Sequence, residues 1–119
     1  MIETAEGREK AEEIITTPGL DGIYIGPADL ALSMGLPAMG DQPQPEHLEE
    51  VKRLIALCKK HRVAVGIHTG GIEYTQKYLE LGCNFIAMGS DSGHMMKAAA
   101  KELAEARGTQ EKQRESTGY

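Results

Sequence analysis

Short apolar runs alternate along the chain with longer segments in which apolar residues recur every three or four positions. The short runs are continuous, as expected for strands buried on both faces of a parallel sheet, and lie at Ile2, Gly22–Ile25, Val63–Ile67 and Phe85–Met88. The longer segments predict amphipathic helices over Arg8–Ile15, His47–His61, Ile72–Leu81 and Met95–Ala106. This order predicts four consecutive βα units joined by right-handed crossovers.

Two further segments carry no such pattern. The stretch Leu36–Gln44 is rich in Pro and Gly and predicts a long loop. Residues 108–119 are polar and lack periodicity, so we expect a disordered tail there. The ordered domain is therefore expected over residues 1–107.

The number of units sets the fold class. Four βα units belong to an α/β fold of the (β/α)8 TIM-barrel type, but a complete barrel takes roughly 250 residues and this chain has 119. Four parallel strands alone would leave two unpaired edges and an open apolar interior. We therefore expect a half-barrel, either a fragment of a longer protein or a chain that completes itself by pairing with another copy.

Composition excludes several classes of partner. The net charge of −5 argues against a nucleic-acid-binding protein, which needs a clustered basic face. No apolar run approaches the roughly 18 residues that a membrane span requires, and no signal peptide opens the chain. Cys58 and Cys83 form no CxxC pair, which favours reduced, semi-buried thiols over a zinc site or a disulfide framework. We expect a cytoplasmic protein.

Two acidic residues occupy equivalent places in consecutive βα units. Glu3 follows the first strand, and Asp29 follows the second strand by a short turn. The carboxyl ends of parallel strands form the active-site face of such folds, and two carboxylates there can share one hard divalent cation. Alternatively, Glu3 and Asp29 each cap the start of the following helix. Spacing alone leaves both interpretations open.

The turn before Asp29, Gly26-Pro27-Ala28-Asp29, is a second candidate. A ligand can approach Gly26 closely, and Pro27 suits the first turn of a helix. The amides of Ala28 and Asp29 would then be free to donate to a carboxylate or phosphate. A plain strand-to-helix turn explains the same residues equally well.

Longer motifs narrow these alternatives. They are IET at Ile2–Thr4, DGIYIGPADLALSMG at Asp21–Gly35, GIHTGG at Gly66–Gly71 and KYLELGCNFIAMGSD at Lys77–Asp91. Together they resemble the HpcH/HpaI aldolase family over about Met1–Ala106, which corresponds to the second half of the family domain.

The resemblance implies a class II aldolase, a carbon–carbon lyase. Glu3 and Asp29 match the carboxylates that bind a divalent metal (Mg²⁺, Mn²⁺ or Co²⁺), and the amides of Ala28 and Asp29 match those that hold the carboxylate of a 2-oxo acid. A 4-hydroxy-2-oxo acid would be cleaved through a metal-stabilised enolate to pyruvate, or a close analogue, and an aldehyde. The family's acid/base histidine and substrate-binding arginine lie on strands absent here, so no residue of this chain takes those roles.

The same resemblance implies a homo-oligomer. Family members assemble as hexamers of dimers that exchange the last helix, so Gly93–Ala106 is the segment expected to swap. Met95 and Met96 in this segment are expected to fill a core or an interface.

Two rival functions remain. One is a phosphosugar-binding barrel enzyme that uses Gly70-Gly71 and Gly89-Ser90 for phosphate; the other is an inert, truncated half-barrel. Among weaker candidates, His68 and Thr69 are expected at the pocket rim. The remaining polar helix residues are expected to face solvent: His47, His61, His94, Glu46, Glu49 and Glu50.

Overall fold

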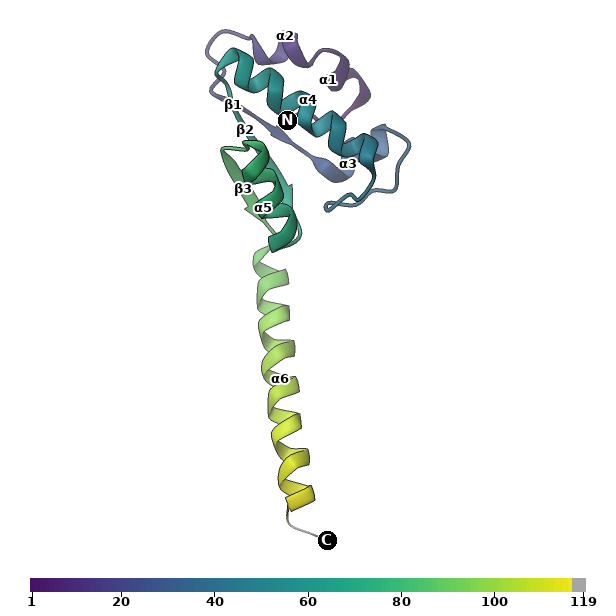
Figure 1. The fold of residues 1–119 in the computed structure, drawn as a ribbon, viewed down its shortest axis with the longest axis vertical. Coiled ribbons are helices and arrows are strands. Elements are labelled where there is room, and N and C mark those ends of the chain that lie inside the picture. Colours follow the sequence, from purple (N-terminus) through teal and green to yellow (C-terminus); the bar gives the residue numbers. More distant parts are fainter. Residues whose placement is uncertain (117–119) are drawn as a thin grey trace. The chain divides into compact units, whose positions relative to one another are not determined.

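The computed structural model describes the backbone of residues 1–116 and the side chains of residues 1–108. The chain forms two compact units, the first spanning Met1–Met88 and the second beginning at Gly89. The first unit contains, in chain order, α1 (Ala5–Glu9), α2 (Ala11–Ile15), β1 (Gly22–Ile25), α3 (Pro27–Ser33), α4 (Pro45–His61), β2 (Ala64–Thr69), α5 (Ile72–Leu81) and β3 (Phe85–Met88) (Figure 1). The second unit contains α6 (Asp91–Ser116).

The sheet of the first unit is parallel, as the sequence predicts. Its strands lie in the order β1-β2-β3, and β1 and β3 have the predicted bounds. The predicted first strand is a single residue: Ile2 forms a parallel bridge with Ile25, and its N–H donates to the carbonyl of Tyr24 at 2.8 Å. The structure is thus a partial α/β fold in which no barrel closes.

The helices of the first unit begin and end near their predicted bounds, with one exception. Pro45 occupies the first turn of α4, and α5 ends at Gly82, whose φ of 106° suits glycine. The exception is the helix expected over Arg8–Ile15, which is two short helices, α1 and α2, that meet at Lys10. The loop predicted over Leu36–Gln44 contains no helix or strand.

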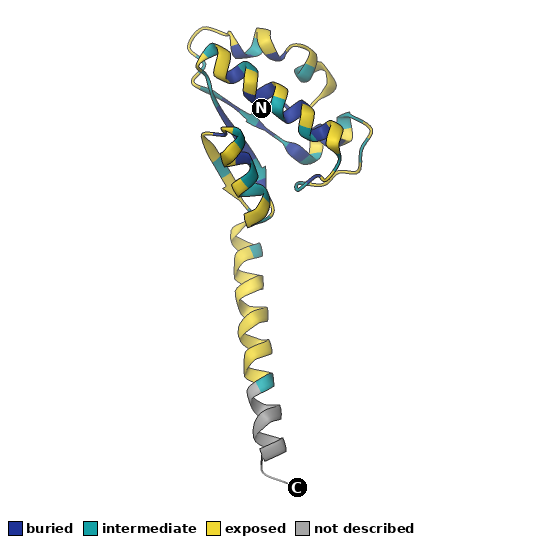
Figure 2. Cartoon of the chain, in the orientation of Figure 1, coloured by how far each residue is buried: buried dark blue, intermediate teal, exposed yellow. Residues whose placement is uncertain are grey.

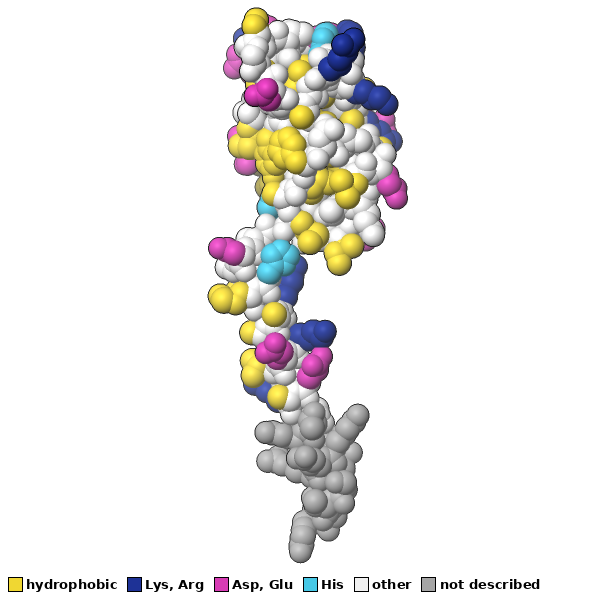
Figure 3. Space-filling view, turned by 90° about the vertical axis from the view of Figure 1, so that its left-hand side faces the viewer, with side chains coloured by type: hydrophobic (Ala, Val, Ile, Leu, Met, Phe, Trp, Pro, Cys, Tyr) yellow, Lys and Arg dark blue, Asp and Glu magenta, His cyan; other side chains and the backbone are white. Residues whose placement is uncertain are grey.

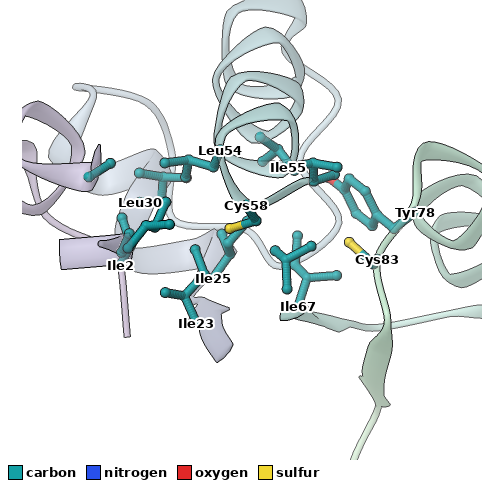
Figure 4. Packing of buried hydrophobic residues seen from close by; sticks show 14 residues of the cluster. Ile2, Ile23, Ile25, Leu30, Leu54, Ile55, Cys58, Ile67, Tyr78 and Cys83 are labelled. Carbon is teal, nitrogen blue, oxygen red and sulfur yellow. The ribbon is translucent and has the colours of Figure 1, made fainter. Parts of the chain in front are cut away.

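The core lies between one face of the sheet and the helices. The bridge at the start of the chain and the three strands each contribute one isoleucine to a row of paired residues across the sheet, formed by Ile2, Ile25, Ile67 and Ile86. Leu54, Ile55 and Cys58 of α4 point toward this row, and Tyr78 of α5 closes its far end (Figure 4). The buried side of α4 therefore faces the strands, while its other side is exposed (Figure 2).

The opposite face of the sheet carries aromatic residues. Tyr24 of β1 stacks on Phe85 of β3 with ring centroids 5.8 Å apart, and the Phe85 ring crosses Gly66, where a β-carbon would collide with it. Phe85 is nevertheless 46% exposed. Hydrophobic side chains gather on one face of this unit in the space-filling view (Figure 3). Parallel sheets are covered on both faces in complete α/β domains, so the first unit has an incomplete core.

The helix α6 is longer than predicted. It begins at Asp91, where Ser90 Oγ accepts a hydrogen bond from the N–H of Gly93 at 3.1 Å, and it continues to Ser116. It thus extends past residue 108, where the segment that we expected to be a disordered tail begins. The last part of that predicted tail, residues 117–119, lies outside the described residues. None of the helices in the described range is long and apolar enough to cross a bilayer.

Glu50 corrects one prediction for α4. It was expected on a solvated face, but it is only 9% exposed and pairs with two arginines. Arg53 binds it at 2.7 Å within the same helix, and Arg8 Nε lies 3.2 Å away on α1. Burial alone would raise the pKa of Glu50, but the hydrogen bonds and charges of Arg53 and Arg8 outweigh burial and hold the pKa below its ordinary value.

Candidate functional site

The isoleucine row determines which side chains reach the carboxyl edge of the sheet. Side chains alternate between the two faces of a strand, so the residue after each buried isoleucine faces away from the helices. These residues are Glu3 after Ile2, Gly26 after Ile25 and His68 after Ile67. Glu3 therefore lies next to the strand position that leads into the predicted metal-binding turn.

Gly26 makes room for the carboxylate of Glu3. A β-carbon built on Gly26 would collide with Glu3 Oε2 and would lie 3.1 Å from Glu3 Cβ. The N–H of Gly26 donates to the carbonyl of Ile2 at 3.3 Å, which fixes the two segments side by side. Since the φ of Gly26 is −90°, glycine is required here for this close approach and not for an unusual backbone conformation.

Asp29 lies in the first turn of α3, on the exposed surface. Pro27 is the first residue of this helix, and no side chain caps its start. The first amides of a helix have no partner within the helix, so the N–H groups of Ala28 and Asp29 point out of the start of α3. The structure thus places Gly26 beside Glu3, and Pro27, Ala28 and Asp29 follow Gly26 in the first turn of α3.

The capping alternative is wrong for both acidic residues. Thr4, not Glu3, caps α1, since its Oγ1 accepts a hydrogen bond from the N–H of Gly7 at 3.0 Å. The residue at the N-cap of α3 is Gly26, and the carboxylate of Asp29 makes no capping hydrogen bond.

The candidate metal-binding oxygens that this chain supplies are of the type that a hard divalent cation prefers. Glu3 and Asp29 offer carboxylate oxygens, and neither takes part in an ion pair within residues 1–108. The described residues contain no group of three or more His, Cys, Asp or Glu side chains placed to hold a metal. Two protein ligands are few, but hard cations such as Mg²⁺ often bind through one or two carboxylates and complete their shell with water and substrate.

His68 and Thr69, both expected at the pocket rim, lie on opposite faces of the sheet. His68 lies within β2, half-buried, on the same face as Glu3. Thr69 faces the helices instead; it is fully buried, and its hydroxyl lies 2.6 Å from the hydroxyl of Thr75. Thr69 is therefore part of the packing between β2 and α5, and the prediction of a rim position is wrong.

The prediction that His47 faces solvent is also wrong. His47 is fully buried, and its Nε2 lies 3.1 Å from the carbonyl oxygen of Pro27. The sequence contains the signal for this burial, because His47 precedes Val51 by four residues and Leu54 by seven and so lies on the apolar face of α4. Of the other two histidines, His94 is exposed and His61 is half-buried, with its Nε2 2.8 Å from Glu12 Oε1.

The glycines Gly70 and Gly71, proposed for phosphate binding, lie against the side chain of Asp41 instead. Asp41 Oδ1 accepts a hydrogen bond from the N–H of Gly70 at 2.8 Å, and Asp41 Oδ2 lies beside Gly71. The Asp41 carboxylate would repel a phosphate group at this position. It also already accepts the hydrogen bond of the Gly70 N–H, which a phosphate would need as a donor. Sequence reasoning missed Asp41, because it comes from the loop 29 residues earlier.

A cavity of the first unit lies away from these residues. A cavity of about 510 Å³ opens between the end of α4 and the end of α5, lined by residues such as Lys59, Arg62 and Leu81. It borders Asp21 and Asn84, which precede β1 and β3, so it lies at the amino ends of the strands. It is separate from Glu3 and Asp29, which follow the carboxyl ends.

The parallel sheet, the helices that connect its strands and the position of the candidate site define the class of protein. The chain is part of a parallel α/β domain whose candidate functional residues lie at the carboxyl edge of the strands. The family model described as HpcH/HpaI aldolase/citrate lyase matches residues 1–98, and the chain belongs to this family.

The chain is similar to curated aldolases over part of their length. It is 36% identical over 106 residues to a 5-keto-4-deoxy-D-glucarate aldolase of Klebsiella pneumoniae and 33% identical over 107 residues to a hydroxypyruvate/pyruvate aldolase of Paraburkholderia phytofirmans. A solved structure of a family protein from Burkholderia cenocepacia superposes with a TM-score of 0.82 at 36% identity. These matches cover 89–90% of this chain but 40% of each relative, so the chain spans about two fifths of their length.

Proposed function

We propose that this chain carries the metal-binding and oxo-acid-binding part of an aldolase site. Glu3 and Asp29 would hold Mg²⁺, Mn²⁺ or Co²⁺, and the amides of Ala28 and Asp29 would hold the carboxylate of a 2-oxo acid. The observation that carries this proposal is the close approach of the Glu3 carboxylate to Gly26, at the start of the turn that presents Asp29. Family membership supports the reaction class.

The proposed reaction cleaves a 4-hydroxy-2-oxo acid. The C3–C4 bond breaks, the 4-hydroxyl loses its proton as an aldehyde forms, and the electron pair passes to C3 and the 2-oxo group before C3 takes up a proton to give pyruvate. A bound divalent cation supplies Lewis acidity for the 2-oxo group. The residues of this chain would orient the acid: the two amides donate to its carboxylate, and Gly26 leaves space for the carboxylate of Glu3 beside the turn.

The proton transfers need an acid/base group, and we assign none to this chain. His68 lies on the same face of the sheet as Glu3, but no contact among residues 1–108 gives it a role in proton transfer. We therefore assign the complete reaction to the longer domain and the binding of metal and 2-oxo acid to this chain.

Oligomerisation is proposed from α6. Met95, Met96 and Leu103 are 69%, 70% and 56% exposed, and no residue of α6 between Asp91 and Arg107 is buried. Met95 and Leu103 are eight residues apart, so they lie on one side of the helix. An apolar stripe of this kind supports the exchange of the last helix between subunits.

Pyruvate binding in the presence and absence of metal tests the proposed function. With Mn²⁺ present, calorimetry should detect pyruvate binding to the chain, and EDTA should abolish it. Binding that survives EDTA would refute the metal-dependent site and favour an anion site of another kind. No binding under either condition would support the inert half-barrel.

A further inference from the structure

The buried ring of His47 connects α4 to the turn that carries Asp29. His47 is the third residue of α4, and its contact with the Pro27 carbonyl spans 20 residues of sequence. A carbonyl oxygen only accepts, so Nε2 carries the hydrogen and donates. Burial lowers the pKa of His47, although the hydrogen bond to Pro27 and the nearby Glu50 charge act in the opposite direction. The lowered pKa favours the neutral ring. Nδ1 is buried and has no hydrogen-bond partner within the described residues.

The single hydrogen bond of this ring reaches a helix that has little support of its own. α3 has seven residues, no side chain caps its start, and Pro27 contributes no N–H. Pro27 is buried, and it stands between Gly26, which touches Glu3, and Asp29, which follows two residues later. A displacement of the Pro27 carbonyl therefore moves Asp29 relative to Glu3.

We propose that His47 is a positioning residue that fixes the turn Gly26–Asp29 so that Asp29 and Glu3 can bind one cation together. The proposal rests on the proposed function, since it gives His47 a purpose only if Glu3 and Asp29 hold a metal. It differs from simple core packing in one respect. Packing needs an apolar group of suitable volume, whereas positioning needs a hydrogen-bond donor at the place of Nε2.

The variants follow from this difference. His47→Leu keeps an apolar side chain but loses the donor, and His47→Gln keeps an N–H donor near the position of Nε2. Ile55→Ala is the matched control, because Ile55 is also buried on α4 but points toward Tyr78 of α5, away from α3 (Figure 4). All three variants should lose some stability, so stability alone does not decide the question.

Two measurements on the purified chain decide it. The first is hydrogen exchange of the Leu30 amide, which donates to the carbonyl of Gly26 at 2.9 Å, without metal. The second is the dissociation constant for Mn²⁺. His47→Leu should speed the exchange of Leu30 and weaken Mn²⁺ binding, each by about tenfold. His47→Gln should restore most of both, and Ile55→Ala should change neither beyond its effect on global stability.

The outcomes separate the two proposals. If His47→Leu matches the wild type, or if His47→Gln fails to restore what His47→Leu loses, the positioning role is refuted. If Ile55→Ala at equal stability has the same effect as His47→Leu, the role is packing alone. If the wild type binds no Mn²⁺ through Glu3 and Asp29, the proposed function fails and the purpose given to His47 fails with it. In that case the exchange of Leu30 still shows whether His47 orders the turn.

Discussion

At the scale of single residues, the site depends on which face of the sheet each side chain takes. Glu3 faces away from the helices because Ile2 before it is buried, and its carboxylate finds space because residue 26 has no side chain. Asp29 needs no such constraint, since it sits on the surface in the first turn of α3. The two carboxylates are thus presented by different means, one by strand alternation and one by a proline-started helix.

The two cysteines allow a test of the core at this scale. Burial raises the pKa of both Cys58 and Cys83 to about 11. At pH 8 only about one thiol in a thousand would be ionised. We predict that a thiol reagent such as DTNB reacts with neither cysteine in the native chain and with both in urea. Rapid, stoichiometric reaction of either thiol in the absence of denaturant would contradict the packing described for this core.

At the scale of helices and strands, α1 is held to α4 by charged and hydrogen-bonding side chains, since α1 itself has no buried residue. Glu50 forms ion pairs with Arg53 of its own helix and with Arg8 of α1. In addition, Arg53 Nη2 donates a hydrogen bond to the backbone carbonyl of Arg8 at 2.9 Å. α1 begins two residues after Glu3, so this cluster also restrains the segment that leads out of the candidate site.

We predict that Glu50→Gln costs about 1–2 kcal/mol of unfolding free energy, because it leaves two arginines without their shared carboxylate. Glu49→Gln is the control: its ion pair with Lys52 is exposed, so the cost should stay below about 0.5 kcal/mol. Urea denaturation of both variants measures the difference. Equal costs would show that burial adds nothing to the Glu50 cluster.

The loss for Glu50→Gln should also depend on pH. The pKa of Glu50 is lower in the folded chain than its ordinary value of 4.5, so its carboxylate contributes stability above that pH. This contribution disappears as the pH falls below 4.5 toward the folded pKa. The difference between wild type and Glu50→Gln should therefore shrink on acidification over that range.

The sequence predicted the elements better than their contacts. Strands β1 and β3 and helix α5 have the predicted bounds because hydrophobic periodicity and Gly82 mark them locally. The break at Lys10 has no such mark. The burial of His47 and Glu50 depends on Pro27 and Arg8, which are distant in sequence. Likewise, the sequence predicted Glu3 and Asp29 after the carboxyl ends of consecutive strands, but neither the contact of Glu3 with Gly26 nor the hydrogen bond of Gly70 to Asp41, which depends on the path of a loop, was predicted.

At the scale of the whole molecule, the chain represents about two fifths of the length of its relatives. The exposed Tyr24–Phe85 stack and the apolar stripe of α6 are both surfaces that a longer or oligomeric protein would cover. The chain belongs to the HpcH/HpaI aldolase/citrate lyase family, while its reaction and its substrate are proposals.

The stripe on α6 leads to a prediction about assembly. If it binds a second copy, the wild type is oligomeric, and the double variant Met95→Glu, Leu103→Glu dissociates because charge replaces apolar contact. Lys101→Glu, a charge change at another exposed position of α6, should leave the oligomer intact. Light scattering after size exclusion gives the masses. A monomeric wild type, or a double variant with unchanged mass, would contradict the proposed exchange of this helix.

A Mn²⁺ titration followed by electron paramagnetic resonance tests whether Glu3 and Asp29 bind one divalent cation together. We expect one site in the wild type and a loss of affinity of about tenfold or more in both Glu3→Gln and Asp29→Asn. Asp21→Asn, at the opposite end of β1, should bind as the wild type does. Unchanged affinity in the double variant Glu3→Gln, Asp29→Asn would contradict the claim.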